Sequence, residues 1–417
     1  MSFGFQFDDS EMDDEYVSLG GGGSVGVSAP SSAVTATASA KAPFRSHSLE
    51  DLISRLPSRI SYSCIDVDLT RSADNADASQ GPPRRCRILR RDLFDARFQM
   101  LLDDDEDDED EDEDMDVDVN AARRDQSQSS RAQIDQDSDL VPGIYEGGLK
   151  TWECALDLID TLDSLLPPPP PPPSSSSLLS SGQADASAYN RHQNVLELGC
   201  GTALPTLYLL EPQWLGTHLH LSDYNADVLS LVTLPNLILA WYNSPASEAF
   251  RRDQGLQLAR AEAQELDRRG QSHFDTSLST LPTQLQEGEL SLTPELITAF
   301  VSSLERYAVR LGFYSGSWSH FPPALTPGRP LDLILTSETI YSLHSLPSLV
   351  SLLRQYSSFH PSITTTTATT VLVAAKVIYF GVGGGVESFK HAIAPATTTP
   401  LKQVTRGVGR TVLRVDF

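Results

Sequence analysis

The segment VLELGCGTALP at residues 195–205 constrains the fold more than any other part of the chain. Its first half is a short apolar run, typical of a buried strand, and its second half begins a helical pattern. Gly199 and Gly201 stand between the two, where the absence of a Cβ lets the backbone turn sharply and approach a ligand closely. A strand, a glycine turn and a helix in this order predict one unit of an α/β sheet.

Three later apolar runs have the same character, and helical patterns such as ADVLSLVTLPNLILAW at 226–241 separate them. The runs are HLHLSD at 218–223, LDLILTS at 331–337 and TVLVAAKVIYF at 370–380. Repeated alternation of nearly continuous apolar strands with helices predicts a parallel sheet covered on both faces. The chain closes with VTRGVGRTVLRVDF, whose central glycines predict an antiparallel hairpin at the sheet edge.

Composition divides the chain into an ordered and a less ordered part. Apolar residues are sparse in the N-terminal region 1–138, which we expect to be mostly disordered. Within it, segments 47–60 and 85–102 carry enough pattern to dock onto a folded domain, although a weakly ordered arm is equally compatible with them. The acidic tract 103–116 has no apolar surface to bury, so we expect a solvated linker there.

The remaining residues, 139–417, are predicted to form the α/β domain. Two insertions interrupt it. Residues 165–190 contain seven consecutive prolines and a serine block, which indicate an extended spacer. Residues 244–286 are polar and lack a sustained apolar stripe.

Charge and cysteine usage limit the partners and the compartment. The net charge is −25, and the run from Asp103 to Asp114 supplies twelve negative charges, so the chain repels a phosphate backbone and attracts basic proteins. We therefore expect no direct nucleic-acid partner. The four cysteines form no CxxC pair, and no run of about 18 apolar residues occurs, so we expect reduced thiols, a cytoplasmic and nuclear location and no membrane contact.

The glycine turn departs from the dinucleotide-binding pattern because position 204, where a third glycine would stand, is Leu204. A second strand ends 22 residues after Gly201 at Asp223, whose carboxylate can accept both hydroxyls of a ribose. Two glycines followed by a strand-terminal acid predict a site for a nucleoside-amino-acid ligand, S-adenosylmethionine. The alternative is an ordinary tight turn between a strand and a helix.

Six segments together resemble the seven-strand methyltransferases, in particular the histidine protein methyltransferases. They are EGGLKTWEC (146–154), VLELGCGTALP, LSDYN (221–225), FYSGSWSHF (313–321), DLILTSETIY (332–341) and KVIYFGVGGGVESF (376–389). The resemblance covers residues 140–417 without the insertions and extends to RRDLFDARFQM at 90–100. It implies a seven-strand Rossmann-like methyltransferase domain.

The resemblance also implies a cofactor site drawn from five segments. Lys150 and Trp152 are expected beside the methionine moiety, and Trp318 is expected to stack on the adenine. Ser317 stands where the family usually has an acidic residue, which weakens one adenine contact. The full set of expected cofactor-binding residues is Lys150, Trp152, Glu153, Glu197, Gly199, Cys200, Gly201, Asp223, Tyr224, Asn225, Gly316, Trp318 and Ser337.

Glu338 and Tyr341 follow the strand at 331–337 and are the expected catalytic residues. A carboxylate can screen the positive charge that develops on a methylated nucleophile, although Glu338 could equally be a structural partner of a nearby group. An imidazole with a pKa of about 6.5 is largely neutral near pH 7 and needs no strong base. The resemblance implies methylation of the tele nitrogen of a histidine in a large-subunit ribosomal protein by a monomeric enzyme.

Other readings remain open at this stage. A lysine methyltransferase of the same fold differs only in its acceptor, and a noncatalytic module could bind basic proteins through the acidic tract. His218 and His220 alternate along a strand without a third ligand, so we expect no metal site. The glycine-rich segment 381–386 lacks the Lys of a phosphate-binding loop and predicts a flexible loop over the cleft.

Overall fold

The computed structural model describes thirteen stretches of the chain, and every structural statement below concerns them. They are residues 42–70, 84–96, 99, 140–141, 145–146, 148, 150–165, 194–210, 216–257, 287–325, 329–358, 368–381 and 383–417. They belong to one compact unit, Lys41–Phe417. The acidic tract 103–116 and the proline-serine insertion beyond residue 165 lie outside the described residues.

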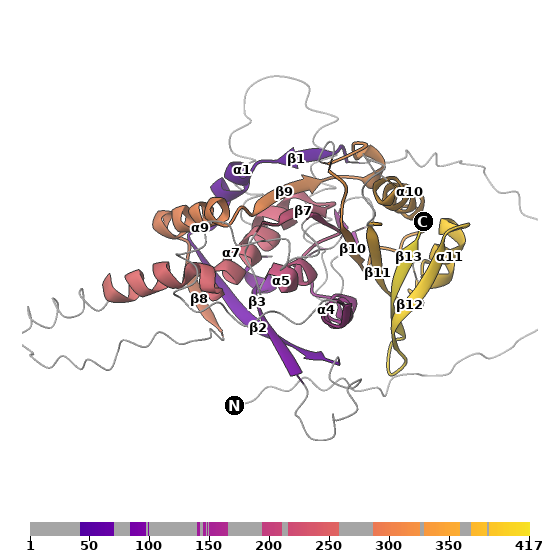
Figure 1. The fold of residues 1–417 in the computed structure, drawn as a ribbon, viewed down its shortest axis with the longest axis horizontal. Coiled ribbons are helices and arrows are strands. Elements are labelled where there is room, and N and C mark those ends of the chain that lie inside the picture. The colour runs from indigo at the N-terminus through magenta and orange to yellow at the C-terminus, as the bar shows by residue number, and fades with distance from the viewer. Residues whose placement is uncertain are drawn as a thin grey trace, which may run out of the picture. The chain divides into compact units, whose positions relative to one another are not determined.

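An eight-stranded sheet with the order β1-β9-β7-β6-β10-β11-β13-β12 forms the centre of this unit (Figure 1). Strands β9, β7, β6, β10 and β11 are parallel, whereas β1 and β13 run antiparallel to their neighbours. Without β1, the sheet has seven strands, as the sequence predicts. The strands are β1 Arg45–His47, β6 Asn194–Leu198, β7 His218–Asp223, β9 Arg310–Ser315, β10 Leu333–Ser337, β11 Thr370–Lys376, β12 Thr397–Val404 and β13 Arg410–Asp416.

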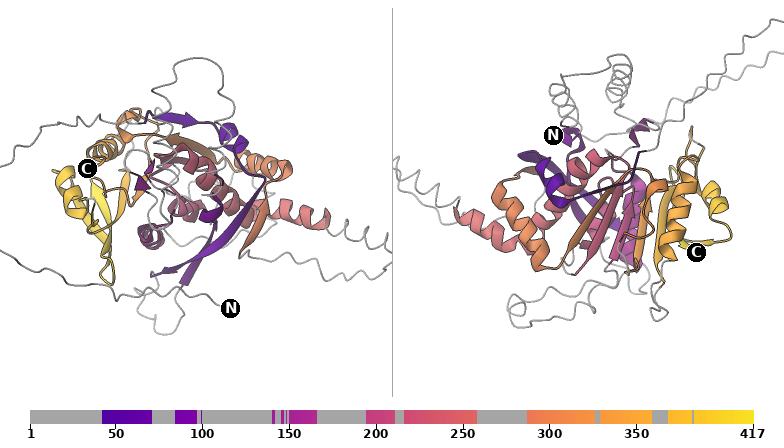
Figure 2. Two further views of the ribbon diagram at one scale, coloured as in Figure 1. Left: turned by 180° about the vertical axis from the view of Figure 1, so that it is seen from behind. Right: turned by 90° about the horizontal axis from the view of Figure 1, so that it is seen from above.

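Helices cover both faces of the sheet, as the right-hand view of Figure 2 shows. Successive residues of a strand point to opposite faces, so Val195 of β6 packs in one core cluster and Leu196 in the other. The first cluster contains α4 Glu153–Leu165, α5 Leu204–Leu210, α7 Leu234–Asn243 and α9 Pro294–Arg306. The second contains α10 Leu346–Ser357 and α11 Val386–Ile393. The doubly covered parallel sheet confirms the predicted fold class.

The folded unit starts near Lys41, about a hundred residues before the predicted boundary at 139. Strand β1 extends the central sheet, and α1 Leu49–Ser54 follows it. Three antiparallel strands form a second sheet: β2 Arg59–Leu69, β3 Arg84–Arg91 and β8 Gly288–Ser291. Its residues Ile60, Ile88 and Leu89 are buried in the first core cluster. Composition understates this region because β2 alternates polar and apolar residues, which lowers its average hydrophobicity.

Shorter elements connect these layers. They are β4 Leu140–Val141, β5 Tyr145–Glu146, α6 Ala226–Val228, the π-helix η3 Leu229–Thr233, the 3-10 helix η4 Pro245–Ser247 and the 3-10 helix η6 Trp318–His320. The predicted polar insertion 244–286 is described up to residue 257. This part includes η4, and the ring of Phe250 lies 5.8 Å from that of Trp241, so the start of the insertion packs on the core.

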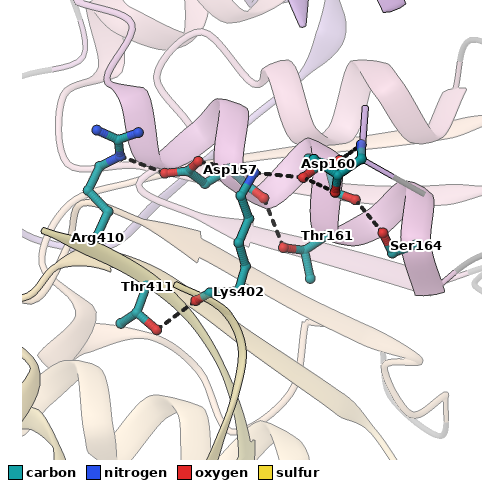
Figure 3. Close-up of polar contacts among 8 residues, drawn as sticks. Asp157, Asp160, Thr161, Ser164, Lys402, Arg410 and Thr411 are labelled. Carbon is teal, nitrogen blue, oxygen red and sulfur yellow. Dashed lines mark hydrogen bonds and ion pairs between the residues drawn. The ribbon is translucent and has the colours of Figure 1, made fainter. Parts of the chain in front are cut away.

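One face of α4 ties distant parts of the chain together (Figure 3). Asp157 accepts a hydrogen bond from Arg410 Nε at 2.6 Å, and Asp160 accepts one from Lys402 Nζ at 2.6 Å. Arg410 and Lys402 belong to the predicted C-terminal hairpin, which the structure shows as β12 and β13. Asp163, one turn further along α4, pairs with Arg84 of β3. Helix α4 is therefore held to both the hairpin and the N-terminal strands.

Candidate cofactor and acceptor site

The glycine turn after β6 leaves a cradle that a side chain would fill. Gly199 has φ +64° and Gly201 has φ +47°, a left-handed conformation that favours glycine. A Cβ on Gly199 would lie 2.7 Å from Thr339 Cγ2, and one on Gly201 would lie 3.5 Å from Gly148 Cα. The Thr233 hydroxyl donates to the Gly201 carbonyl at 2.8 Å. The turn is thus fixed from several sides by neighbouring protein groups.

Asp223 lies at the carboxyl end of β7, beside this cradle. Its Oδ2 accepts from the Gly201 N–H at 3.0 Å, and its Oδ1 accepts from the Asn225 N–H at 3.2 Å. Each carboxylate oxygen can accept a further hydrogen bond. The side chain is buried, so the carboxylate has a fixed orientation next to the turn.

Glu197 occupies a different position from Asp223. It is buried, and its carboxylate accepts hydrogen bonds from the backbone N–H and the hydroxyl of Thr206 in α5. Burial raises the pKa of the Glu197 carboxyl to about 8, although the bonds from Thr206 oppose the shift. Glu197 therefore supports the turn by connecting β6 to α5.

The segment before α4 lies along the glycine turn. Thr151 meets Thr202 at 3.5 Å between their hydroxyls and accepts from Arg90 at 2.7 Å. Trp152 carries two ammonium groups near its ring, since Lys150 Nζ lies 4.6 Å and Lys376 Nζ 4.4 Å from the ring centre. The structure thus brings Lys150 and Trp152 to the same edge of the sheet as the turn, whereas Glu153 begins α4 with an exposed side chain.

A second group of predicted residues gathers after β7 and β9. The Gly316 N–H donates to the Tyr224 carbonyl at 3.1 Å. The N-terminal segment crosses this point, because Ser317 N donates to the Ala42 carbonyl at 3.0 Å and a Cβ on Gly316 would clash with the Pro43 carbonyl. Trp318 begins η6 and packs partly buried against the second core cluster. Ala42 and Pro43 therefore belong to this part of the site, although the sequence alone indicated no role for them.

The predicted catalytic residue Glu338 follows β10 with φ +58°. Its Oε2 accepts a hydrogen bond from the Tyr379 hydroxyl at 2.6 Å, whereas Glu338 Oε1 and Ser337 Oγ are buried without a hydrogen-bond partner among the described residues. Burial raises the pKa of Tyr379, and the nearby Glu338 raises it further. The ring of Tyr341 lies 6.3 Å from that of Tyr379, edge to face.

Sequence reasoning missed Lys376, Tyr379 and Thr339 as members of the site. All three lie within segments quoted for the family resemblance, but only a sheet that places β11 beside β10 shows that Tyr379 reaches Glu338. The glycine-rich segment 381–386 also differs from the predicted flexible loop. A Cβ on Gly384 would lie 2.1 Å from the Tyr341 carbonyl oxygen, so the segment packs directly against the Tyr341 loop.

The two histidines of β7 have structural partners. His220 is buried between Asn194 Oδ1 and the Tyr314 hydroxyl, each 3.0 Å from a ring nitrogen. Burial lowers the pKa of His220 to about 3 and that of His218 to about 4. Among the described residues, no group of three or more His, Cys, Asp or Glu side chains is arranged to hold a metal ion.

Comparison with known proteins identifies the family. The chain is 30% identical over 321 residues to Histidine protein methyltransferase 1 of Saccharomyces cerevisiae, covering 75% of this chain and 70% of that protein. It is also 30% identical over 292 residues to the Schizosaccharomyces pombe protein of the same name, covering 67% and 68%. The chain belongs to the histidine protein methyltransferase family. A Bos taurus homologue is 27% identical over 288 residues, or 67% of this chain and 58% of that protein.

Other comparisons add little to this family assignment. No protein-family model matches the chain. Among solved structures, an O-methyltransferase from Bacillus cereus in complex with SAH covers 64% of this chain and 91% of its own, at 10% identity and a TM-score of 0.24. A putative O-methyltransferase from Klebsiella pneumoniae has 14% identity and a TM-score of 0.27, covering 64% and 92%.

Membership of the family makes the chain a protein methyltransferase that uses S-adenosylmethionine. The residues present fit this cofactor, because the cradle at Gly199 and Gly201 has no Cβ to fill it and the fixed carboxylate of Asp223 lies beside it. No helix within the described parts of the chain is both long enough and apolar enough to span a membrane.

Proposed function

We propose that this enzyme methylates the tele nitrogen of a histidine side chain in a protein, and that the protein is a component of the large ribosomal subunit. Family membership supports a histidine acceptor. The observation that carries the proposal is Glu338 Oε1, a buried acceptor to which none of the described residues donates a hydrogen bond, close to the predicted cofactor cradle. A neutral imidazole offers one N–H to such an oxygen and one bare nitrogen to an electrophile.

The cofactor site that we propose uses the residues named from the sequence. S-adenosylmethionine, when bound, supplies an electrophilic methyl group on a sulfonium. The backbone of Gly199, Cys200 and Gly201 would line its path, and Asp223 would accept from the ribose hydroxyls. The remaining members have less specific roles: Lys150, Trp152 and Ser337 toward the methionine end, Tyr224, Asn225, Gly316 and Trp318 toward the adenine end, and Glu153 and Glu197 in support.

Glu338 and Tyr341 would act on the acceptor. The carboxylate of Glu338 would screen the positive charge that develops on the ring as it becomes methylated, which an oriented buried acceptor does without reorganising. Tyr341 would border the acceptor ring, since its own ring packs against Tyr379. No strong base is required, because much of an ordinary histidine is neutral near pH 7.

Trp152 favours histidine over the alternative lysine acceptor. A lysine methyltransferase has to receive a cation and deprotonate it, commonly beside an aromatic face. Here Lys150 and Lys376 already lie within 4.6 Å and 4.4 Å of the Trp152 ring centre. A lysine ammonium that approaches the cofactor would be repelled by these two ammonium groups, whereas a neutral imidazole would not.

Exposed apolar side chains next to the site support the proposal that the acceptor histidine is part of a polypeptide. We name them the apolar rim: Leu343, Val377, Ile378, Phe380 and Val408. Their loops are joined, because Ser342 bridges to Gly383 and Val377 N donates to the Gly409 carbonyl at 2.8 Å. A contiguous exposed apolar patch beside an active site is typical of a surface that binds a partner. We propose that the rim contacts the substrate segment that flanks the histidine.

The net charge and the cysteines support a proposal for the partner protein and the cellular compartment. The strong negative charge favours a basic protein such as a ribosomal one and disfavours direct nucleic-acid contact. The four cysteines, all within the described residues, form no disulfide, which suits a reducing cytoplasm and nucleus. We propose a monomer, since the rim is assigned to the substrate.

The decisive experiment is transfer of labelled methyl from S-adenosylmethionine to an extract of cells lacking this enzyme, followed by location of the modified residue. We expect label on one histidine of a large-subunit ribosomal protein, as the tele isomer. Label on lysine would contradict the acceptor that we propose, and label on another protein would contradict the substrate.

A noncatalytic role for the acidic tract needs a separate test. Deleting residues 103–116 should leave cofactor affinity unchanged, because the tract carries none of the site residues. If capture of the protein substrate were lost while methyl transfer to a short acceptor peptide persisted, the tract would be a recognition element. Unchanged capture would identify it as a linker.

A further inference from the structure

Glu338 is held through one carboxylate oxygen by a donor whose direction is fixed. The Tyr379 hydroxyl donates to Oε2 at 2.6 Å and accepts from the Lys376 backbone N–H at 3.2 Å. Because the hydroxyl lone pair is engaged by Lys376, its single proton is directed at Glu338. The backbone of Tyr379 is fixed as well, since its N–H donates to the Gly384 carbonyl at 3.3 Å.

The other oxygen has no such partner. Oε1 is buried, and none of the described residues donates a hydrogen bond to it. Burial raises the pKa of the Cys154 thiol, and the charge of Glu338 and a hydrogen bond between the thiol and the Glu338 carboxyl group raise it further. Oε1 itself meets no donor in hydrogen-bond geometry among the described residues. A buried acceptor without a donor destabilises the protein, so a protein that keeps one commonly has a ligand to supply the donor.

The position of Glu338 indicates which ligand that is. Thr339, the next residue, contacts the cradle where Gly199 lacks a Cβ. Cys154, two residues after Trp152, neighbours the carboxylate from the opposite segment. The unpartnered oxygen therefore belongs to the part of the site where both proposed cofactor segments meet, and where the acceptor has to enter.

We propose that Tyr379 is a positioning residue that orients Glu338 so that Oε1 accepts the N–H of the acceptor imidazole and thereby selects the nitrogen that is methylated. This inference rests on the proposed function. With the pros N–H held by Oε1, the tele nitrogen is the one without a proton and with a free lone pair.

The bonding changes balance without a further reactant. The tele nitrogen forms a bond to the methyl carbon, the carbon–sulfur bond breaks, and its electron pair stays on sulfur as a neutral thioether. The ring then carries one positive charge next to the Glu338 carboxylate. Loss of the pros proton to that carboxylate, and from it to water, returns the neutral methylated ring.

The test compares the full-length enzyme with Tyr379→Phe, which removes one oxygen and keeps the ring. The acceptor is the peptide carrying the histidine located by the labelling experiment. We expect kcat to fall about 10–100-fold, since a misplaced reactive group costs up to this much. The KM for S-adenosylmethionine should stay within about twofold, because Tyr379 is outside the cofactor set. The other methylhistidine isomer should appear in the hydrolysed product.

Binding provides a readout that does not depend on turnover. Calorimetry without cofactor should show the acceptor peptide binding about fivefold more weakly to Tyr379→Phe, the loss expected for one weakened hydrogen bond. The matched control is Tyr356→Phe in α10, a buried tyrosine whose hydroxyl donates to the Pro322 carbonyl at 2.8 Å. The control should match the wild type in isomer ratio and peptide affinity.

Each result bears on the inference. A wild-type isomer ratio, kcat and peptide affinity in Tyr379→Phe would overturn it. Equal losses of stability, cofactor affinity and activity, with one isomer retained, would also overturn it, because they indicate a merely structural tyrosine. Failure of the proposed function looks different, since the wild-type enzyme itself would then yield no methylhistidine, and the inference would fall with it.

Discussion

At the scale of single residues, Asp223 has two tasks that a substitution can separate. Its carboxylate anchors the glycine turn through the Gly201 N–H and the Asn225 N–H. It is also the residue that we propose for the ribose. If Asp223 only anchors the turn, its substitution should loosen the turn. If Asp223 also binds the ribose, its substitution should lower the affinity for the cofactor even in a variant that largely keeps the anchoring hydrogen bonds.

We expect Asp223→Ala to weaken binding of S-adenosylhomocysteine at least about 100-fold, since two hydrogen bonds to a charged acceptor contribute about 1.5–3 kcal/mol each. Asp223→Asn keeps one acceptor oxygen and should lose about tenfold. Calorimetry measures the affinity, and circular dichroism checks that both variants are folded. Unchanged affinity in Asp223→Ala would remove the ribose role.

At the scale of elements, α4 joins the site to the rest of the fold. Its first residues follow Trp152, and its buried carboxylates at 157, 160 and 163 recur every three residues, so they share one face. The Asp160 carboxylate accepts a hydrogen bond from Lys402 Nζ and another from the Thr70 backbone N–H, each at 2.6 Å. Lys402 Nζ also lies 3.2 Å from Asp157 Oδ1, so two carboxylates of α4 share this ammonium group.

We expect Asp160→Ala to lower the free energy of unfolding by about 2–3 kcal/mol, because the hydrogen bonds from Lys402 and Thr70 to a charged acceptor are lost while Asp157 still pairs with Lys402. The control is Asp66→Ala, because the side chains of Asp66 and its partner Arg87, 2.8 Å apart, are exposed and their attraction is screened by solvent, so stability should change little. Urea unfolding measures both. Similar small effects in the two variants would show that α4 is not held by this contact.

The apolar rim is the second element-scale feature with a testable consequence. We expect Phe380→Ser to raise the KM for the protein substrate about tenfold or more, since burying a phenylalanine contributes about 1.5–3 kcal/mol. The affinity of the Phe380→Ser variant for S-adenosylhomocysteine should not change. Phe380 is 86% exposed, and Phe94, 80% exposed after β3, provides the matched control Phe94→Ser. If both variants had the wild-type KM, the rim would not contact the substrate.

At the scale of the whole molecule, stability depends on pH through the buried imidazole of His220. Burial first, then His218 and Arg329, lower its pKa to about 3. The unfolded chain protonates this histidine near pH 6.5, whereas the folded chain keeps it neutral until about pH 3. The folded state therefore binds fewer protons in this range, and this contribution to stability is lost as the pH falls.

We expect His220→Asn to destabilise the protein at pH 7.5, where the hydrogen bonds to Asn194 and Tyr314 are lost. The wild type loses stability as the pH falls, and the variant lacks this loss. The difference in the free energy of unfolding between the two proteins should therefore shrink by about 2–3 kcal/mol between pH 6.5 and 4.5, at about 1.4 kcal/mol for each pKa unit. Urea unfolding at several pH values measures it. Glu197, whose raised pKa acts in the opposite direction, is present in both proteins and cancels. A constant difference would show that His220 is not held neutral.

Local pattern was sufficient for the parallel sheet, the glycine turn, the C-terminal hairpin and the strand-terminal Asp223. Each of these is encoded by neighbouring residues, because a strand, a tight turn or a helix depends on spacing within a few positions. The family and the cofactor follow from several such units together.

Only the tertiary structure decided how distant segments meet. It placed β1, β2 and β3 in the folded unit, although their surroundings are acidic and polar, because pairing with β9 and β8 completes their hydrogen bonds. It also brought Tyr379 to Glu338 and Lys376 to Trp152, across separations that no local pattern encodes. The chemistry of the acceptor side depends on such contacts, since the orientation of a carboxylate is set by the groups that surround it in space.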